Sequence, residues 1–160
     1  MAITINDLQN AVRDRLNCDP WMIEHGVAWL AENQLDIEFE ITKHIGNQGI
    51  VGLVMTPALS YQGMADDYTV SYKVNELVLQ VTETPILNRG RLNAGTALDA
   101  CARAVAQLMK PYRFVMAPKG INQAEVKAFL VAKATLQTAM ICAAPTAESE
   151  TMETVEEDPI

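Results

Sequence analysis

The sequence feature that most constrains the fold is residues 70–83, which read as one long β-strand. Apolar residues alternate with polar ones in two sets that are one residue out of phase: Val70, Tyr72 and Val74, then Leu77, Leu79 and Val81. This period-2 spacing is typical of a strand with one buried face. The change of phase at residues 75–76 indicates a β-bulge, which inserts one residue and redirects the side chains. Thr84-Pro85 is expected to end the strand, because proline has no N–H to donate to a neighbouring strand.

A helix is expected to follow this strand. Residues 88–95 read as a polar loop with two glycines. The helix is predicted to begin at about Thr96, with Thr96 as its N-cap and Asp99 as a weak capping-box partner. Pro111 is expected to stop it. Its apolar face is predicted to consist of residues at helical spacing, namely Ala97, Cys101, Ala104, Val105 and Leu108.

This strand–loop–helix segment resembles a segment of small bacteriophage tail-assembly proteins of the tail terminator, or tail completion, type. The shared pattern is a long strand, the run Glu83-Thr84-Pro85-Ile86-Leu87-Asn88-Arg89, a Gly-Thr pair and an alanine-rich helix that ends before a proline. The resemblance covers about residues 35–112 and is strongest at residues 83–111. The insertion Arg91-Leu92-Asn93 sets the loop of this chain apart.

The resemblance implies a virion structural protein that is assembled in the host cytoplasm and acts in the tail or neck. Such a subunit forms a homo-oligomeric, hexameric ring on the end of the tail tube, stops tube growth and joins the tail to the head connector. The expected partners are therefore further copies of the chain, the tail tube protein, and a head–tail connector or neck protein. A neck protein or minor tail protein of the same fold is the alternative within this class.

Assembly contacts are expected in two loops, residues 61–68 and residues 85–95, because loops on a rigid sheet are free to be shaped for a partner. Two arginines of the second loop are the strongest candidates for subunit or tube contacts. Arginine forms fork-like hydrogen bonds with carboxylates and is enriched at interfaces. The predicted interface residues are Glu83, Pro85, Asn88, Arg89 and Arg91.

The composition fits one domain with an acidic extension. The chain has 160 residues, of which 49% are hydrophobic and only 6% aromatic, so the core must be built from Val, Ile, Leu, Ala and Met. Six acidic residues lie at positions 148–158 and carry most of the formal net charge of −8. We expect an α+β domain at residues 1–143 and an acidic, disordered tail at residues 144–160. A role of this tail in an interaction is the alternative.

Charge and hydropathy argue against two classes of function. The near-neutral body of the chain lacks the basic surface that nucleic-acid binding needs. No apolar run reaches the roughly 18–20 residues of a membrane span. The first residues have neither the basic nor the apolar region of a secretory signal. We therefore expect neither specific nucleic-acid binding nor membrane binding.

The sequence carries no motif for catalysis or metal binding. It has no Gly-x-Ser-x-Gly elbow, no GxxxxGK[ST] phosphate loop and no histidine with a convincing Ser or Cys partner. A zinc site from Cys18, His25 and His44 lacks a CxxC or HxxxH pair. We expect no enzyme activity, no cofactor and no metal. The alternative function is a small anion- or ligand-binding α+β module, in which amides of residues 90–96 bind an anion at the helix N-terminus.

The remaining elements complete the expected fold. A helix is predicted at residues 4–17, with Thr4 and Asp7 as its capping pair. Residues 35–45 fit both a strand and a helix, and the resemblance favours the helix, with Gly46 as its C-cap. The other predictions are strands at residues 22–25, 49–55, 112–117 and 125–141, a loop at residues 58–68 and a turn at residues 118–120. Together they predict a single α+β domain in which a mixed or antiparallel β-sheet packs against two to three α-helices.

Overall fold

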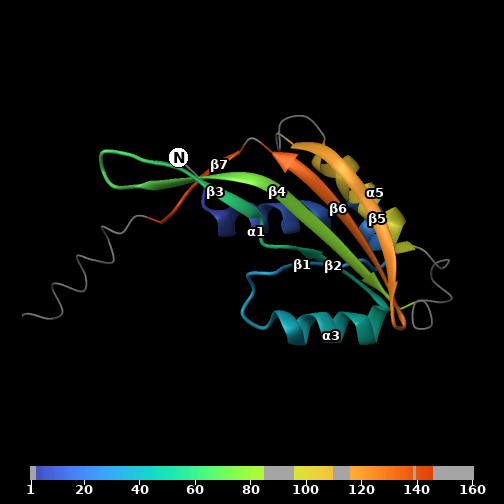
Figure 1. Cartoon of the computed structure of the whole chain (residues 1–160). Helices are drawn as coiled ribbons and strands as arrows, with labels where there is room; N and C mark the ends of the chain where they lie inside the picture. Colours follow the sequence, from blue (N-terminus) through green and yellow to red (C-terminus); the bar gives the residue numbers. More distant parts are fainter. Residues whose placement is uncertain (1–2, 85–95, 110–115, 139, 146–160) are drawn as a thin grey trace, which may run out of the picture.

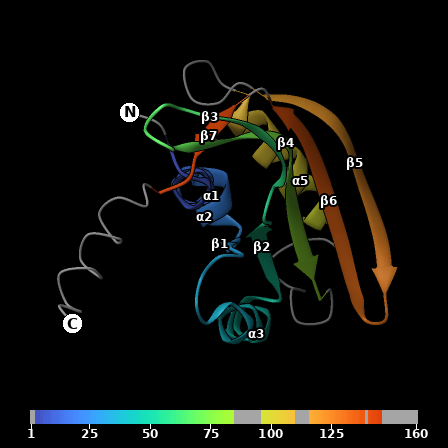
Figure 2. The same ribbon diagram turned by 60° about the vertical axis from the view of Figure 1, so that its left-hand side comes forward.

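A mixed β-sheet with helices on both faces forms the fold (Figures 1 and 2). The computed structural model describes residues 3–84, 96–109, 116–138 and 140–145. The predicted single-domain α+β class is confirmed. The elements within these residues are α1 (Ile5–Asn17), α2 (Pro20–Glu24), β1 (Trp29–Ala31), α3 (Ile37–Gln48), β2 (Ile50–Val54), β3 (Ala58–Met64), β4 (Val70–Glu83), α5 (Thr96–Leu108), β5 (Met116–Val126), β6 (Phe129–Thr138) and β7 (Ile141–Ala143).

Strand β4 is the centre of the sheet. Its first half pairs with β3 and β7, and its second half pairs with β2 and β6. The main path of the sheet runs in the order β1-β2-β4-β6-β5. β1 and β2 are parallel, and the other described pairs are antiparallel. The long strand that the sequence predicts is therefore the element on which the rest of the sheet is built.

The predicted change of phase in β4 is confirmed. Ala58 of β3 pairs with Glu76, but the next residue of β3, Leu59, pairs with Val74. Asn75 is therefore the extra residue of a bulge, and it moves the buried positions from Val74 to the odd-numbered residues that follow. The bulge lies where the neighbours of β4 change from β3 and β7 to β2 and β6.

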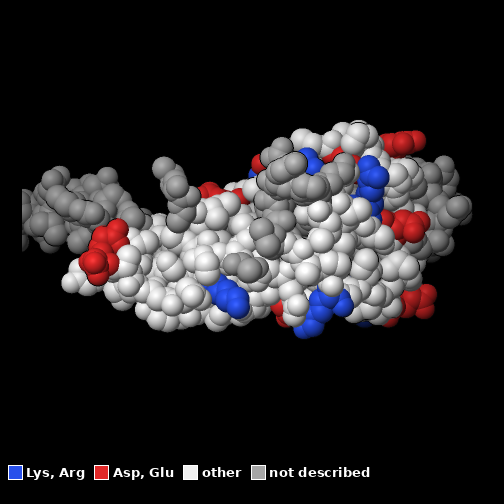
Figure 3. Space-filling model, turned by 90° about the horizontal axis from the view of Figure 1, so that it is seen from above, with Lys and Arg blue, Asp and Glu red and all other residues white. Residues whose placement is uncertain are grey.

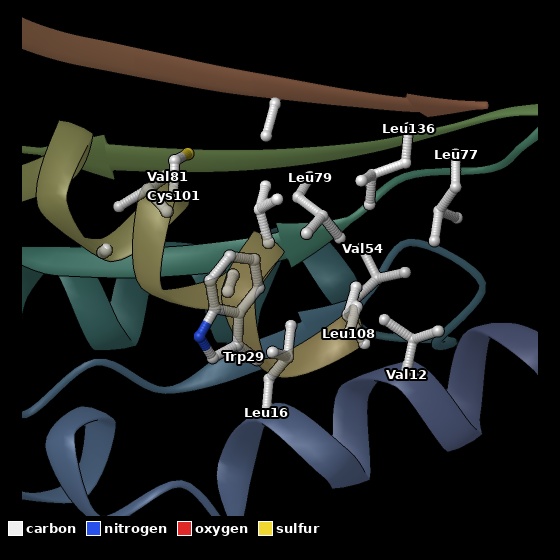
Figure 4. Close-up of a cluster of buried hydrophobic side chains, with 14 of the residues drawn as sticks. Val12, Leu16, Trp29, Val54, Leu77, Leu79, Val81, Cys101, Leu108 and Leu136 are labelled. Carbon is white, nitrogen blue, oxygen red and sulfur yellow. The ribbon is translucent and has the colours of Figure 1, made fainter. Parts of the chain in front are cut away.

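Helices α1 and α5 cover one face of the sheet and form the main core with it. Trp29 lies there among aliphatic side chains from α1, β4 and α5, including Leu16, Leu79 and Leu108 (Figure 4). The predicted cap of α1 is confirmed, because the Thr4 hydroxyl accepts the Asp7 N–H and the Asp7 carboxylate accepts the Thr4 N–H. The predicted start of α5 at residue 96 and its apolar face are also confirmed.

Thiol reagents are expected to modify one of the three cysteines in the folded protein and all three after unfolding. Cys18 is exposed, whereas Cys101 and Cys142 are buried. Burial raises the pKa of the Cys101 thiol to about 12 and also raises the pKa of Cys142, so both stay protonated near neutral pH. The thiolate is the reactive form. A chromogenic thiol assay checks this count, and rapid labelling of Cys101 in the native protein would contradict its burial.

Helix α3 covers the other face of the sheet at the end formed by β1 and β2. Ile37, Ile41 and Ile45 pack there on a small cluster of buried residues from these strands. The predicted helix is confirmed, but its C-cap is Gly49 and not Gly46. Gly49 has φ 76°, the left-handed conformation that glycine adopts without strain, and its N–H bonds to the Ile45 carbonyl oxygen.

Three local predictions are wrong. The strand expected at residues 22–25 is instead α2, because Asp19 accepts the Met22 N–H as an N-cap and Pro20 occupies the first turn. The loop expected at residues 58–68 contains strand β3. The turn expected at residues 118–120 is a bulge within β5, where Lys119 is the residue without a partner in β6.

The two predicted strands at the end of the domain are reassigned in part. Residues 112–115 lie outside the described residues, and β5 begins at Met116. The strand expected at residues 125–141 is divided: its first residues belong to β5, a two-residue turn at 127–128 follows, and β6 and β7 supply the rest. Lys127 accommodates this turn with φ 58°. The predicted acidic tail lies outside the described residues from residue 146 onward.

Candidate functional site

An open groove lies between α3 and the β5–β6 hairpin, on the face of the sheet opposite α1 and α5. Its volume is about 640 Å³. Residues of β4, β6 and β5 form the floor and far wall of this groove. Figure 2 shows these strands beside α3, which packs on β1 and β2. Its apolar lining consists of Ile41, Ile45, Ala124, Val126, Phe129 and Val131.

The strand register explains which side chains line the groove. On β6, Ala132, Ala134 and Leu136 are buried in the main core, so the alternate residues Val131 and Lys133 point to the groove. The residues of β5 that pair with groove-lining residues of β6 continue the same surface, because paired residues share a face. The polar part of the lining consists of Thr42, Gln80, Thr82, Asn122 and Lys133.

The groove exposes apolar surface that the described part of the chain does not cover. Val126 is 53% exposed and Phe129 is 37% exposed. None of the residues of α3 is fully buried, although the helix carries three isoleucines on the side that faces the sheet. A helix normally buries its apolar stripe against the core. Apolar surface gathered in this way is typical of a site for another molecule.

Strand β5 forms the edge of the sheet beside the groove. Among the described strands it pairs with β6 alone. Its first half carries Pro118, a bulge, and Lys119, whose Nζ lies 2.8 Å from a carboxylate oxygen of Glu76. These features discourage pairing with a further strand. Its second half, residues 121–126, carries one charge, Glu125, and no proline. This half of the edge is therefore open to a partner strand.

The hairpin of β3 and β4, residues 58–72, projects from the opposite end of the molecule (Figure 1). We call it the arm. Tyr61, Met64 and Tyr68 are 63%, 55% and 80% exposed. Tyr68 has φ 67° in the turn, a strained conformation for a bulky residue. An aromatic tip on an extended hairpin has few contacts with its own domain, which is expected of a segment that contacts a partner.

Acidic side chains lie at the end of the arm. Asp66 and Asp67 are the only charged residues between positions 58 and 72. Hydrogen bonds from the Thr69 side chain and backbone lower the pKa of Asp67, so its carboxylate is charged at neutral pH. Figure 3 shows acidic side chains at this end of the molecule and a broad uncharged surface beside them.

Of the predicted interface residues, the structure describes Glu83 alone. Glu83 is 0% exposed, and its Oε1 accepts the backbone N–H of Ala97 at 3.0 Å. The carboxylate at the end of β4 therefore occupies the N-terminus of α5, where negative charge is favoured. The buried Glu83 side chain is therefore not available for a direct contact with a partner. Pro85, Asn88, Arg89 and Arg91 lie outside the described residues.

The sequence analysis missed a buried polar cluster that joins α2 to α5. Asp19 is 3% exposed and accepts hydrogen bonds from the Met22 N–H, from Gln107 and, at 3.0 and 2.8 Å, from Nε and Nη2 of Arg103. The hydrogen bonds with Asp19 raise the pKa of Arg103. No sequence neighbour of Asp19 signals its bonds to Arg103 and Gln107, because these two residues lie on a helix more than eighty positions away.

Cys18, His25 and His44 are the residues from which a zinc site could be imagined, and Cys18 is an exposed free cysteine. His25 stacks on Trp21 with ring centroids 4.0 Å apart, and its Nδ1 lies 2.8 Å from the Trp21 carbonyl oxygen. His44 lies 3.6 Å from a carboxylate oxygen of Glu40. Within the described residues, no group of three or more His, Cys, Asp or Glu side chains could hold a metal ion.

No helix within the described ranges is long and apolar enough to span a membrane. Comparison of the sequence with known protein families and with curated proteins finds no match. The groove, the open edge and the arm are therefore the features of the molecule that bear on its function.

Proposed function

We propose that this chain is a ring-forming structural subunit of a phage tail, of the tail terminator type that residues 83–111 resemble. In this role, copies of the chain close into a hexameric ring on the end of the tail tube, stop its growth and offer a surface to the head connector. The observation that carries the proposal is a pair of unlike surfaces at opposite ends of the molecule, the arm and the groove, which the described residues leave exposed.

A closed ring of more than two copies needs two different surfaces on each subunit, because one patch docks on another patch of the next copy. The arm and the groove satisfy this requirement. A symmetric dimer needs only one self-complementary patch. The open half of the β5 edge is a third surface, and a strand of a neighbouring chain can pair with it.

The anion-binding alternative has less support. Its best feature was the N-terminus of the helix that begins at Thr96, but Glu83 already supplies a carboxylate there. The open cavity of about 640 Å³ lies on the other face of the sheet and is mainly apolar. An assembly subunit therefore fits the described surfaces better than a phosphate- or nucleotide-binding module.

Light scattering at several protein concentrations tests the proposal. We expect a discrete species of ring mass, or a monomer that becomes one when tail tube protein is added. A double substitution, Arg89→Ala with Arg91→Ala, is expected to abolish the ring and leave a monomer with the wild-type melting temperature, because it removes the predicted contacts of the 85–95 loop. Arg13→Ala with Lys43→Ala removes the same charge elsewhere and serves as the control. A strict monomer, with or without tube protein, would contradict the proposed function.

A further inference from the structure

We infer that the arm of one copy docks in the groove of the next copy. This inference rests on the proposed function and names the contact that joins the subunits. The occupant of the groove is thus residues 58–72 of a neighbouring chain, and not a small molecule or an unrelated protein.

The geometry requires two copies. In both ribbon views, the arm projects from one end of the molecule, and α3 and the turn of the β5–β6 hairpin lie at the other (Figures 1 and 2). Residues of α3 and of this hairpin line the groove. An arm therefore does not reach the groove of its own chain. Docking of arm in groove is a head-to-tail contact, which repeats from copy to copy and closes into a ring when the rotation allows it.

The side chains of the two surfaces match in kind. The arm exposes two tyrosines and a methionine, Tyr61, Tyr68 and Met64, which are residue types enriched at interface centres. The groove offers an apolar lining to the tyrosine rings and the methionine. Its polar residues include Gln80 and Asn122. Their amide groups can accept hydrogen bonds from tyrosine hydroxyls or donate hydrogen bonds to them.

The charges also match. Both charged residues of the arm, Asp66 and Asp67, are acids, and the one charged residue that lines the described groove, Lys133, is a base. Lys133 is exposed and makes no ion pair with another described residue. Opposite charges on two surfaces fix their register and speed their encounter.

The edge of β5 gives an extended arm a place to lie. Residues 122, 124 and 126 of this strand line the groove. In the antiparallel pair with β6, every second residue of β5 directs its backbone N–H and C=O groups to β6, and the residues between them direct theirs to the open side of the edge. An added strand satisfies such groups, and side-chain pockets beside it supply specificity. A hairpin is already extended, so little conformational entropy is lost when it docks.

Cysteine cross-linking between copies tests the contact. In a Cys18→Ser background, which removes the exposed native thiol, one preparation carries Met64→Cys on the arm and another carries Val126→Cys in the groove. After mixing and mild oxidation, we expect a covalent dimer from the mixture and not from either preparation alone. We also expect assembly to slow the reaction of the Val126→Cys thiol with a soluble reagent by about tenfold or more, because the docked arm covers it.

Several results would overturn the inference. A ring of full mass without the mixed cross-link, or with the Val126→Cys thiol as reactive as in the monomer, would mean that another contact joins the copies and that the groove is left for a different occupant. A cross-link from a single preparation would mean a symmetric contact. These results leave the proposed ring intact, whereas a wild-type chain that stays monomeric under all conditions overturns both the ring and this contact.

A charge exchange gives a second, independent readout. Asp66→Lys with Asp67→Lys, or Lys133→Glu alone, is expected to raise the concentration of half-assembly by about tenfold or more. The chain that carries all three substitutions is expected to recover most of this loss. Glu24→Lys, an exposed change on α2, is the control and should leave assembly unchanged. Equal losses for the control, or no recovery in the combined variant, would overturn the pairing of arm and groove.

Discussion

Replacing Gly52 with alanine is expected to lower the free energy of unfolding by about 3 kcal/mol or more. A β-carbon at this position lies 2.4, 2.6 and 2.7 Å from three ring atoms of Trp29, well inside van der Waals contact. Gly52 and Trp29 are direct neighbours in the parallel pair of β2 and β1, and the indole lies across the glycine. Trp29 is 1% exposed and packed into the main core, so the ring cannot move aside without displacing its neighbours.

Denaturant unfolding followed by circular dichroism measures this change. Gly46→Ala is the matched control, because Gly46 lies inside α3 and a β-carbon there meets nothing within 4 Å. Alanine has a higher helix propensity than glycine, so Gly46→Ala is expected to stabilise the protein slightly, by up to about 1 kcal/mol. Trp29→Leu combined with Gly52→Ala should be less destabilised than the two single changes predict together, since the smaller side chain makes room for the methyl group. A Gly52→Ala protein as stable as wild type would show that the indole does not rest on this strand.

The sequence predicts the elements whose signals are local. β4 carries a period-2 pattern, α5 carries a helical stripe, and α1 has a capping box, and each of these needs only neighbouring residues to be recognised. The bulge at Asn75 is visible for the same reason, because an inserted residue changes the phase of the pattern. Together these elements specify the α+β class and the central strand.

The two missed strand segments, β3 and the first half of β5, lack that local signal. Strand β3 has exposed side chains on both faces, because it forms the arm beyond the core, so its sequence shows no alternation. Much of β5 is also exposed, because it is the edge strand of the sheet. Its Pro118-Lys119-Gly120 run resembles a turn in sequence, although it forms a bulge. The segments hardest to predict are therefore the ones that project from the domain, and these form the surfaces of the candidate contact.

The candidate site depends on tertiary arrangement. The groove unites a half-buried helix, α3, with a hairpin more than seventy positions away, and no motif in either announces the other. Sequence reasoning predicted one strand at residues 125–141, but most of these residues form β6, which lies between β4 and β5, so the edge of the sheet is β5. It also placed Glu83 in the interface, but a carboxylate at the end of a strand can equally cap the next helix, and only the fold distinguishes the two.

Replacing Asp19 with alanine is expected to lower the free energy of unfolding by about 2–4 kcal/mol. The substitution removes the N-cap of α2, typically worth about 1 kcal/mol, and leaves the amide of Gln107, a residue that is 6% exposed, without a buried partner. The Arg103 side chain is 40% exposed, so water compensates part of its lost ion pair. Denaturant unfolding gives the value, and Asp14→Ala, which removes an exposed carboxylate paired with Arg13, should change it by less than about 0.5 kcal/mol.

The Asp19 variant also separates stability from assembly. A double-mutant cycle with Arg103→Ala is expected to show a favourable coupling between the two side chains, because they share two hydrogen bonds. This cluster joins α2 to α5, on the face of the sheet opposite the groove. A subunit that loses a few kcal/mol there but remains folded should therefore still form the arm–groove contact. If the Asp19→Ala protein keeps its native circular dichroism but fails to assemble, the subunit contact involves the helical face, and the arm and groove do not carry it alone.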